Sequence, residues 1–196
     1  MAVKYDMNNR IIIVTDYLDD KICDDMLLAL TVMINEDNKN IETIKDFKPN
    51  PIHMYISSPG GFVYPVWGII NLMIESKTPI YTYNVGMCDS MAFQLFLAGD
   101  KRFASKYTRF CYHQIKFTYN SNYQNVVESQ DYLDYCQNNL EEYIMDRTLI
   151  DYETLIDVRL HKKDWVIKPD EAIKLGIVTD MEGVNYAKNK KKKKEK

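Results

Sequence analysis

Two strands that each end in a glycine-containing turn and lead into a helix constrain the fold of this chain most. The first strand spans residues 52–56 and reaches the turn SPGG at residues 58–61. The second spans residues 80–85 and reaches GMCDS at residues 86–90. Strands that alternate with helices in this way indicate an α/β fold with mostly parallel strands and right-handed crossovers.

The two turns also offer the groups that acyl transfer needs. Ser90 is presented to solvent at a strand-to-helix turn, with its hydroxyl near the positive end of the next helix. The other turn supplies glycine N–H groups that can approach a ligand closely. His113 ends a later strand. A serine, a histidine and two sources of oxyanion donors together predict nucleophilic acyl transfer.

Apolar periodicity predicts the remaining elements. We expect further strands at residues 10–14, 102–104, 110–113 and 177–178. We expect helices at about residues 20–33, 65–76, 90–97, 152–160 and 169–175, and a polar loop with room for a short helical turn at 36–50.

The segment 122–147 has a helical pattern of unusual length. Its apolar stripe is interleaved with tyrosines and is interrupted by neither glycine nor proline; the stripe comprises Val126, Leu133, Cys136, Leu140 and Ile144. Such a helix exceeds what one small domain needs to cover its sheet. The aromatic excess predicts packing against another subunit.

Charge and composition exclude several classes of protein. Residues 188–196 hold seven lysines and one glutamate, so the rest of the chain is more acidic than the formal net charge of −3. An acidic body argues against nucleic-acid binding. The N-terminus lacks an apolar signal sequence, and no apolar run is long enough to cross a bilayer, so we expect a cytoplasmic protein that has no membrane contact.

The cysteine pattern argues against a metal site. None of the four cysteines has CxxC spacing with another, so zinc is not expected. Their apolar surroundings predict buried free thiols in a reducing compartment.

These motifs, in this order and spacing, resemble the Clp protease proteolytic subunit, the ClpP family of serine peptidases. The resemblance covers residues 10 to about 180 and is carried by MYISSPGG (54–61), GMCDSMAF (86–93), AGDKRF (98–103), YHQ (112–114), KKDW (162–165) and PDEAIKLGIVTD (169–180). It implies a ClpP/crotonase-like superhelix of α/β/α repeats, with a protruding handle helix at 122–147.

The resemblance also assigns roles to individual residues. Ser90 resembles the nucleophile, His113 the general base and Asp164 the acid that orients the histidine. The backbone N–H groups of Gly61 and Met91 match the oxyanion hole. The resemblance therefore implies a serine endopeptidase with a Ser-His-Asp triad.

The family's assembly leads to expectations about partners. Handle helices would join stacked rings of identical subunits around a closed chamber that admits peptides or unfolded proteins. The chain itself would need no cofactor or metal, and ATP would be used only by a Clp-type ATPase partner. Whether this chain has such an ATPase partner stays open, because family members usually carry a longer N-terminal segment than residues 1–9. We expect one peptidase domain at 10–183 and a disordered Lys-rich tail at 184–196.

Other residues compete for the site roles. His161 is the alternative base, but it reads as a solvated helix end, and His53 is expected to pack on a strand. Cys88 is the alternative nucleophile, although it has no recognisable base. The alternatives to Asp164 are Asp157, Asp170 and Asp180.

Asp89, directly before the nucleophile, stands where the family usually has a small neutral residue. We favour its interpretation as a helix cap, because aspartate suits that position. The other interpretation is that its negative charge raises the pKa of His113 or alters the side of the site that faces the substrate.

Other functions share parts of this pattern. An inactive scaffolding subunit of a Clp-like assembly and a viral head-maturation (prohead) protease of ClpP-like fold are the main alternatives. A signal-peptide peptidase relative would be membrane-associated. An acyl-CoA hydratase or isomerase of the crotonase family would use glutamates in place of the serine and histidine.

Overall fold

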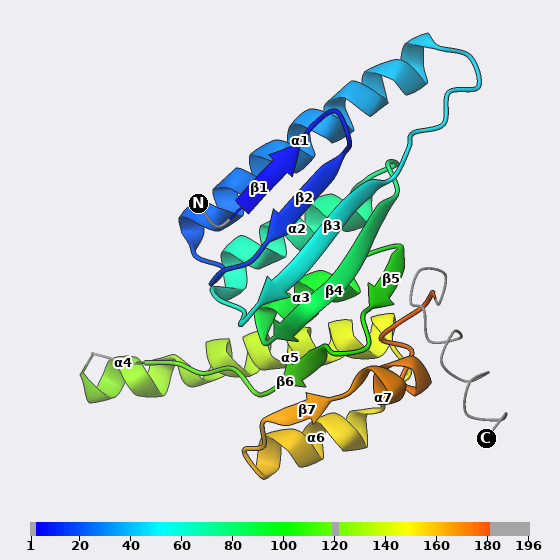
Figure 1. The fold of residues 1–196 in the computed structure, drawn as a ribbon. Helices are drawn as coiled ribbons and strands as arrows, with labels where there is room; N and C mark the ends of the chain where they lie inside the picture. The colour runs from blue at the N-terminus through cyan, green and yellow to red at the C-terminus, as the bar shows by residue number, and fades with distance from the viewer. Residues whose placement is uncertain (1–2, 119–121, 181–196) are drawn as a thin grey trace, which may run out of the picture.

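The computed structural model describes residues 3–118 and 122–180, which form one seven-stranded sheet flanked by helices (Figure 1). The strands are Val3–Asp6 (β1), Ile11–Val14 (β2), Ile52–Ser58 (β3), Ile80–Asp89 (β4), Lys101–Ala104 (β5), Arg109–Tyr112 (β6) and Trp165–Ile167 (β7). The helices are Asp20–Thr43 (α1), Val63–Glu75 (α2), Met91–Leu97 (α3), Tyr123–Glu128 (α4), Gln130–Arg147 (α5), Tyr152–Leu160 (α6) and Pro169–Lys174 (α7).

The sheet is mostly parallel, as predicted. Its order is β1-β2-β3-β4-β6-β7, with β5 beside β4, and only the β1–β2 and β6–β7 pairs are antiparallel. Side chains alternate along β3, so Ile52, Met54 and Ile56 are fully buried while His53 and Tyr55 face the other side. The buried residues pack under α1, α2 and α3, which places the core on one side of the sheet. The α/β fold predicted from the sequence is therefore confirmed.

Strand β4 is longer than predicted, and it changes partners along its length. Residues 81–84 pair with β5, and residues 87–89 pair with β6. The change occurs around Gly86, where an added Cβ would lie 2.2 Å from Ser57 Oγ. Residues 86–89, predicted as part of a turn, are thus strand, because β6 supplies a partner for their backbone. This extension carries the chain directly to Ser90.

The predicted loop at 36–50 was wrong over its first half, where α1 continues to Thr43. The polar sequence of this segment gives no sign that Asp37 is buried. Asp37 is only 2% exposed, and its carboxylate accepts hydrogen bonds from the Arg10 guanidinium at 2.5 Å and the Thr78 hydroxyl at 2.7 Å. A buried carboxylate needs such partners, and these partners hold α1 against the starts of β2 and β4.

The sheet edges also differ from the prediction. Strands β1 and β7 were not predicted, and the strand expected at 177–178 is not formed. The N–H groups of Ile177 and Val178 instead donate to the carbonyl of Ala172 and close the end of α7. Strand β6 ends at Tyr112, so His113 is the first residue after it.

The long helix predicted at 122–147 is present as α4 and α5, with a break at Ser129 (Figure 1). Helix α4 points away from the body and has no buried residue. Tyr123 is 82% exposed, and Val126 and Val127 are about half exposed. Leu140, by contrast, lies in the core of this same chain. The outer half of the segment is therefore the part available to a partner.

Three further sequence predictions concern the cysteines, membrane-spanning segments and the C-terminal tail. All four cysteines are buried free thiols, as predicted. Within residues 3–118 and 122–180, no helix combines the length and the apolar character needed to span a membrane. The predicted Lys-rich tail at 184–196 lies outside the described residues.

Candidate active site

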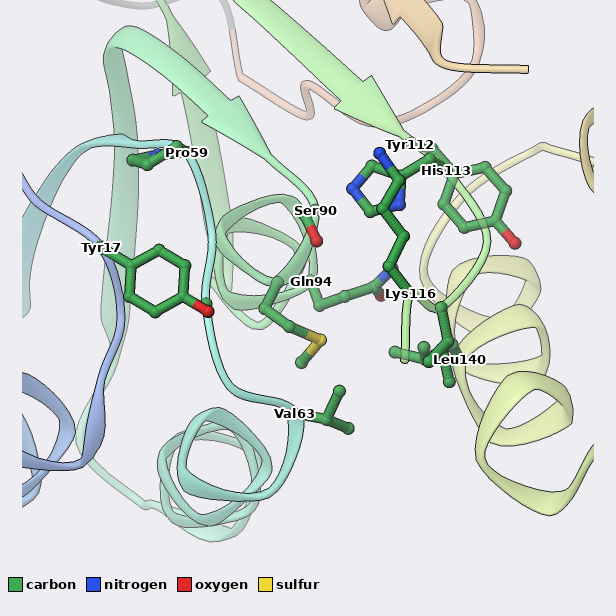
Figure 2. A pocket seen from close by; sticks show the side chains of 12 residues that line it. Tyr17, Pro59, Val63, Ser90, Gln94, Tyr112, His113, Lys116 and Leu140 are labelled. Carbon is green, nitrogen blue, oxygen red and sulfur yellow. The ribbon is translucent and has the colours of Figure 1, made fainter. Parts of the chain in front are cut away.

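A cavity of about 230 Å³ opens where the β3–α2 turn, the start of α3 and the segment after β6 meet (Figure 2). Ser90, His113, Gly61 and Met91 all line it. The other lining residues are Tyr17, Pro59, Val63, Gln94, Tyr112, Ile115, Lys116 and Leu140. The structure therefore brings together four of the five predicted site residues, and the fifth, Asp164, is not part of the cavity wall.

Ser90 occupies a sharp elbow between β4 and α3. Its φ of 55° and ψ of −124° lie in a region that non-glycine residues rarely adopt, and such strain often marks a functional site. Its N–H donates to the Cys111 carbonyl at 2.8 Å, which holds the elbow against β6. Gly60, with a φ of 95°, packs so closely that an added Cβ would lie 2.7 Å from Ser90 Cβ. The backbone thus fixes where the Ser90 hydroxyl lies.

The amides of Gly61 and Met91 are available as donors. Leu18 holds the Gly61 segment, because its N–H donates to the Gly60 carbonyl and its carbonyl accepts from Phe62, both at 2.8 Å. Among the described residues, neither the Gly61 nor the Met91 N–H donates to a backbone carbonyl. Two N–H groups beside a serine hydroxyl have the composition of an oxyanion hole.

His113 lies across the cavity from Tyr17, with Ser90 between them (Figure 2). Its Nδ1 is 2.6 Å from the Gln114 carbonyl oxygen. Because a carbonyl oxygen only accepts, Nδ1 carries the proton, and the neutral ring then has its lone pair on Nε2. No hydrogen bond joins His113 to Ser90 within the described part of the chain. The ring nevertheless has the tautomer that a general base needs.

Asp164 is connected to the His113 segment through an antiparallel strand pair. Tyr112, the last residue of β6, pairs with Trp165, the first residue of β7, so His113 and Asp164 each lie one residue beyond this last pair. The Asp164 carboxylate, however, pairs with Lys116 Nζ at 3.4 Å and is 61% exposed. The structure thus places Asp164 directly before the strand that pairs with β6 but joins its carboxylate to a lysine.

The cap interpretation of Asp89 is wrong. Ser90 occupies the cap position of α3, and Asp89 is the last residue of β4. Its carboxylate pairs with the Arg109 guanidinium at 2.7 Å and is 13% exposed. The charge also acts on its strand neighbour, because burial first and Asp89 second raise the pKa of Cys111. A cation from β6 therefore compensates the carboxylate that precedes Ser90.

The competing candidates lie elsewhere. His161 Nδ1 is 2.9 Å from the Asp157 carboxylate at the exposed end of α6. His53 packs on the sheet, with Nδ1 2.9 Å from the Tyr83 hydroxyl, and burial lowers its pKa. Cys88 is fully buried, and burial raises the pKa of its thiol well above the ordinary value. A buried, protonated thiol is a poor nucleophile, which favours Ser90.

The alternative acids have other partners. Asp157 pairs with Lys163, Asp180 pairs with Lys101, and Asp170 lies in the first turn of α7. Within residues 3–118 and 122–180, no three His, Cys, Asp or Glu side chains lie close enough together to hold a metal ion.

Sequence reasoning missed several residues of the site. Tyr17 follows a strand and carried no motif, while Gln94 was hidden in an apolar helix. Lys116 follows the YHQ motif in a polar stretch with no periodicity. The pairing of Arg109 with Asp89 depends on the unpredicted contact between the end of β4 and β6. These positions are set by tertiary contacts rather than by local pattern.

Comparison with known proteins finds one family that matches nearly the whole chain. The model of the Clp protease family matches residues 2–183. An ATP-dependent Clp protease proteolytic subunit of Deinococcus radiodurans is 29% identical over 175 residues, which cover 88% of this chain and 79% of that protein. The ATP-dependent Clp protease proteolytic subunit 1 of Prochlorococcus marinus (strain MIT 9312) is 32% identical over 129 residues, and the match spans 65% of each chain.

Proposed function

Because the chain belongs to the Clp protease family, we propose that it is a serine endopeptidase that uses Ser90, His113 and Asp164 as its triad. The observation that most supports this proposal is the cavity shared by Ser90, His113 and the amides of Gly61 and Met91. Ser90 at a strained elbow, in one cavity with a histidine whose Nδ1 faces a carbonyl oxygen, is an arrangement suited to acyl transfer.

The proposed mechanism follows from the donors and acceptors. Ser90 Oγ attacks the peptide carbonyl carbon, and His113 Nε2 takes the hydroxyl proton and later gives it to the leaving amine. The N–H groups of Gly61 and Met91 stabilise the tetrahedral oxyanion, each by about 2.7–4 kcal/mol. Water then hydrolyses the acyl-enzyme, with His113 again as the base.

Asp164 stabilises the His113 imidazolium once its carboxylate turns from Lys116 to Nδ1. That exchange gives up two contacts: the exposed Lys116–Asp164 ion pair, worth about 0–1 kcal/mol, and the hydrogen bond from His113 Nδ1 to the Gln114 carbonyl, which a charge-assisted bond to the carboxylate replaces. Substrate in the cavity favours the exchange, since Lys116 also lines the cavity. In this proposal the triad is completed during substrate binding.

We also propose an assembly of identical subunits. The exposed apolar side chains of α4 are unsuited to solvent, and stacked rings joined through α4 and α5 would cover them. The sites would then face a chamber that excludes folded proteins. The relatives are described as ATP-dependent, which supports a separate ATPase that feeds unfolded chains to this subunit. The chain itself would bind no cofactor.

The proposed function predicts a choice between folded and unfolded substrates. The purified protein should cleave a reduced, carboxymethylated protein into short peptides and leave the native form of the same protein intact. Pretreatment with diisopropyl fluorophosphate should abolish the cleavage, whereas a chelator should not. Cleavage that survives the fluorophosphate or that disappears with the chelator would contradict a serine mechanism.

Substitutions in α4, the outer part of the predicted handle helix, should split the oligomer into smaller species. Val126→Asp with Val127→Asp places charges on the exposed apolar face of α4, and we expect association to weaken by about tenfold or more. Leu140 is unsuitable for this test, because it is buried and lines the cavity. Sedimentation velocity should show smaller species and a parallel loss of peptidase activity.

The matched control is Gln124→Lys with Gln130→Lys, which changes the charge of the handle by the same amount, keeps a donor for Glu128 and Asp134, and removes no apolar surface. It should sediment like the wild type. A wild-type protein that is monomeric at micromolar concentration and fully active would contradict the chamber and leave the chemistry of Ser90 untouched.

A further inference from the structure

A buried polar cluster joins α5 to the residues on either side of His113. It consists of Tyr112, Gln137, Glu141 and Arg159. Glu141 is fully buried, and Tyr112 and Gln137 are nearly so. Such groups are costly to bury, and a cluster of this kind fixes the geometry of the segments that carry it.

Gln137 makes the central contacts of the cluster. Its side-chain oxygen accepts a hydrogen bond from the Ile115 N–H at 2.9 Å. Its Nε2 donates to the Tyr112 hydroxyl at 3.0 Å and to Glu141 Oε1 at 2.7 Å. One amide thus holds the residue before His113 and the second residue after it.

Glu141 completes the cluster from the same helix face, one turn along α5. Its Oε1 also accepts a longer contact of 3.4 Å from the Tyr112 hydroxyl, and its Oε2 pairs with Arg159 of α6 at 3.3 Å. The Arg159 guanidinium thus faces the carboxylate at ion-pair distance, although Glu141 Oε2 accepts no hydrogen bond among the described residues. Glu141 orients the Gln137 amide so that its oxygen points to Ile115.

The segment that carries His113 has little other support. Strand β6 ends at Tyr112, and within residues 3–118 and 122–180 the hydrogen bond of the His113 ring is to the carbonyl of its neighbour Gln114. Resting on the proposed role of His113 as base, we propose that Gln137 and Glu141 are positioning residues that set where the His113 ring lies relative to Ser90. They act through Tyr112 and Ile115 and do not touch the reacting atoms.

The test compares two substitutions in α5. Gln137→Leu removes the acceptor for Ile115, and we expect kcat to fall by about 10- to 100-fold, since a displacement of about 1 Å can cost that much, with KM nearly unchanged. Ile144→Val alters a fully buried residue of the same helix outside the cluster. It should lower the melting temperature without lowering kcat.

Exchanging the side chains of Gln137 and Glu141 provides a test of whether kcat can be rescued. Gln137→Glu with Glu141→Gln keeps one amide, one carboxylate and an acceptor for Ile115, so it should recover most of the lost kcat. Equal losses of kcat in Gln137→Leu and Ile144→Val, at equal losses of melting temperature, would overturn the positioning role.

A second readout does not depend on activity. The chain has three histidines, so the imidazole proton signal of His113 can be assigned by its loss in His113→Gln. It should shift in Gln137→Leu but not in Ile144→Val, while His53 and His161 stay in place. If the wild type shows no Ser90-dependent hydrolysis, the proposed function fails and this signal alone decides the positioning role. An unmoved His113 signal in folded Gln137→Leu would overturn it.

Discussion

Ser90→Ala is expected to lower kcat for a short fluorogenic peptide by about 10⁵- to 10⁶-fold while the protein still folds and assembles. In the proposed mechanism the hydroxyl forms the acyl-enzyme, and among the described residues the cavity wall has no second serine, threonine or cysteine. The methyl group of alanine fits wherever the serine side chain fits. Circular dichroism and sedimentation should therefore match the wild type, and only turnover should be lost.

The matched control for this variant is Cys88→Ala, two residues earlier. The Cys88 thiol is fully buried, and burial raises its pKa well above the ordinary value, so its removal should leave kcat unchanged. Thiol alkylating reagents should likewise leave the native enzyme active. Full turnover by a clean Ser90→Ala preparation would remove Ser90 from the mechanism.

His113→Ala should cost nearly as much as Ser90→Ala, about 10⁵- to 10⁶-fold in kcat, because groups that act as one unit have non-additive effects. Without the imidazole, the Ser90 hydroxyl has no group to take its proton. The double variant should therefore show the same residual rate as either single variant. Steady-state rates at high enzyme concentration measure all three.

Substitutions of Asp164 and His161 test which residues belong to this catalytic unit and which do not. Asp164→Ala should lower kcat by about 10⁴-fold, because the imidazolium loses its carboxylate partner. His161→Ala should be silent, since its ring is held by Asp157 at the end of α6. If His161→Ala proved as damaging as His113→Ala, the assignment of the base would be wrong.

The parts of the fold that follow a local period could be predicted from the sequence. The alternation of Ile52, Met54 and Ile56 fixes the face of β3, and Asp151, whose side chain caps α6 by accepting from Thr154, begins a helix that was placed with its observed bounds. The polar half of α1 had no such signal. Its position depends on the contact of Asp37 with Arg10 and Thr78, which are distant in sequence.

The features of the site likewise divide into those that could be predicted from the sequence and those that could not. Ser90 and the two glycine-containing turns could be placed because each lies where a strand meets a helix. The partner of Asp89 could not, since Arg109 is joined to it by the unexpected length of β4. The pairing of Asp164 with Lys116 depends on β7, a short edge strand without a pattern. Motifs thus gave the candidate residues, and tertiary pairing decided their contacts.

The most direct test of the central claim is covalent labelling with a fluorophosphonate probe, followed by peptide mass spectrometry. The probe reacts when an activated serine oxygen displaces fluoride from phosphorus, so labelling requires both the nucleophile and its base. We expect the added mass on Ser90 in the wild type, greatly slowed labelling in His113→Ala and normal labelling in His161→Ala. An active wild-type enzyme that carries the label on another residue, or that carries none, would contradict the account.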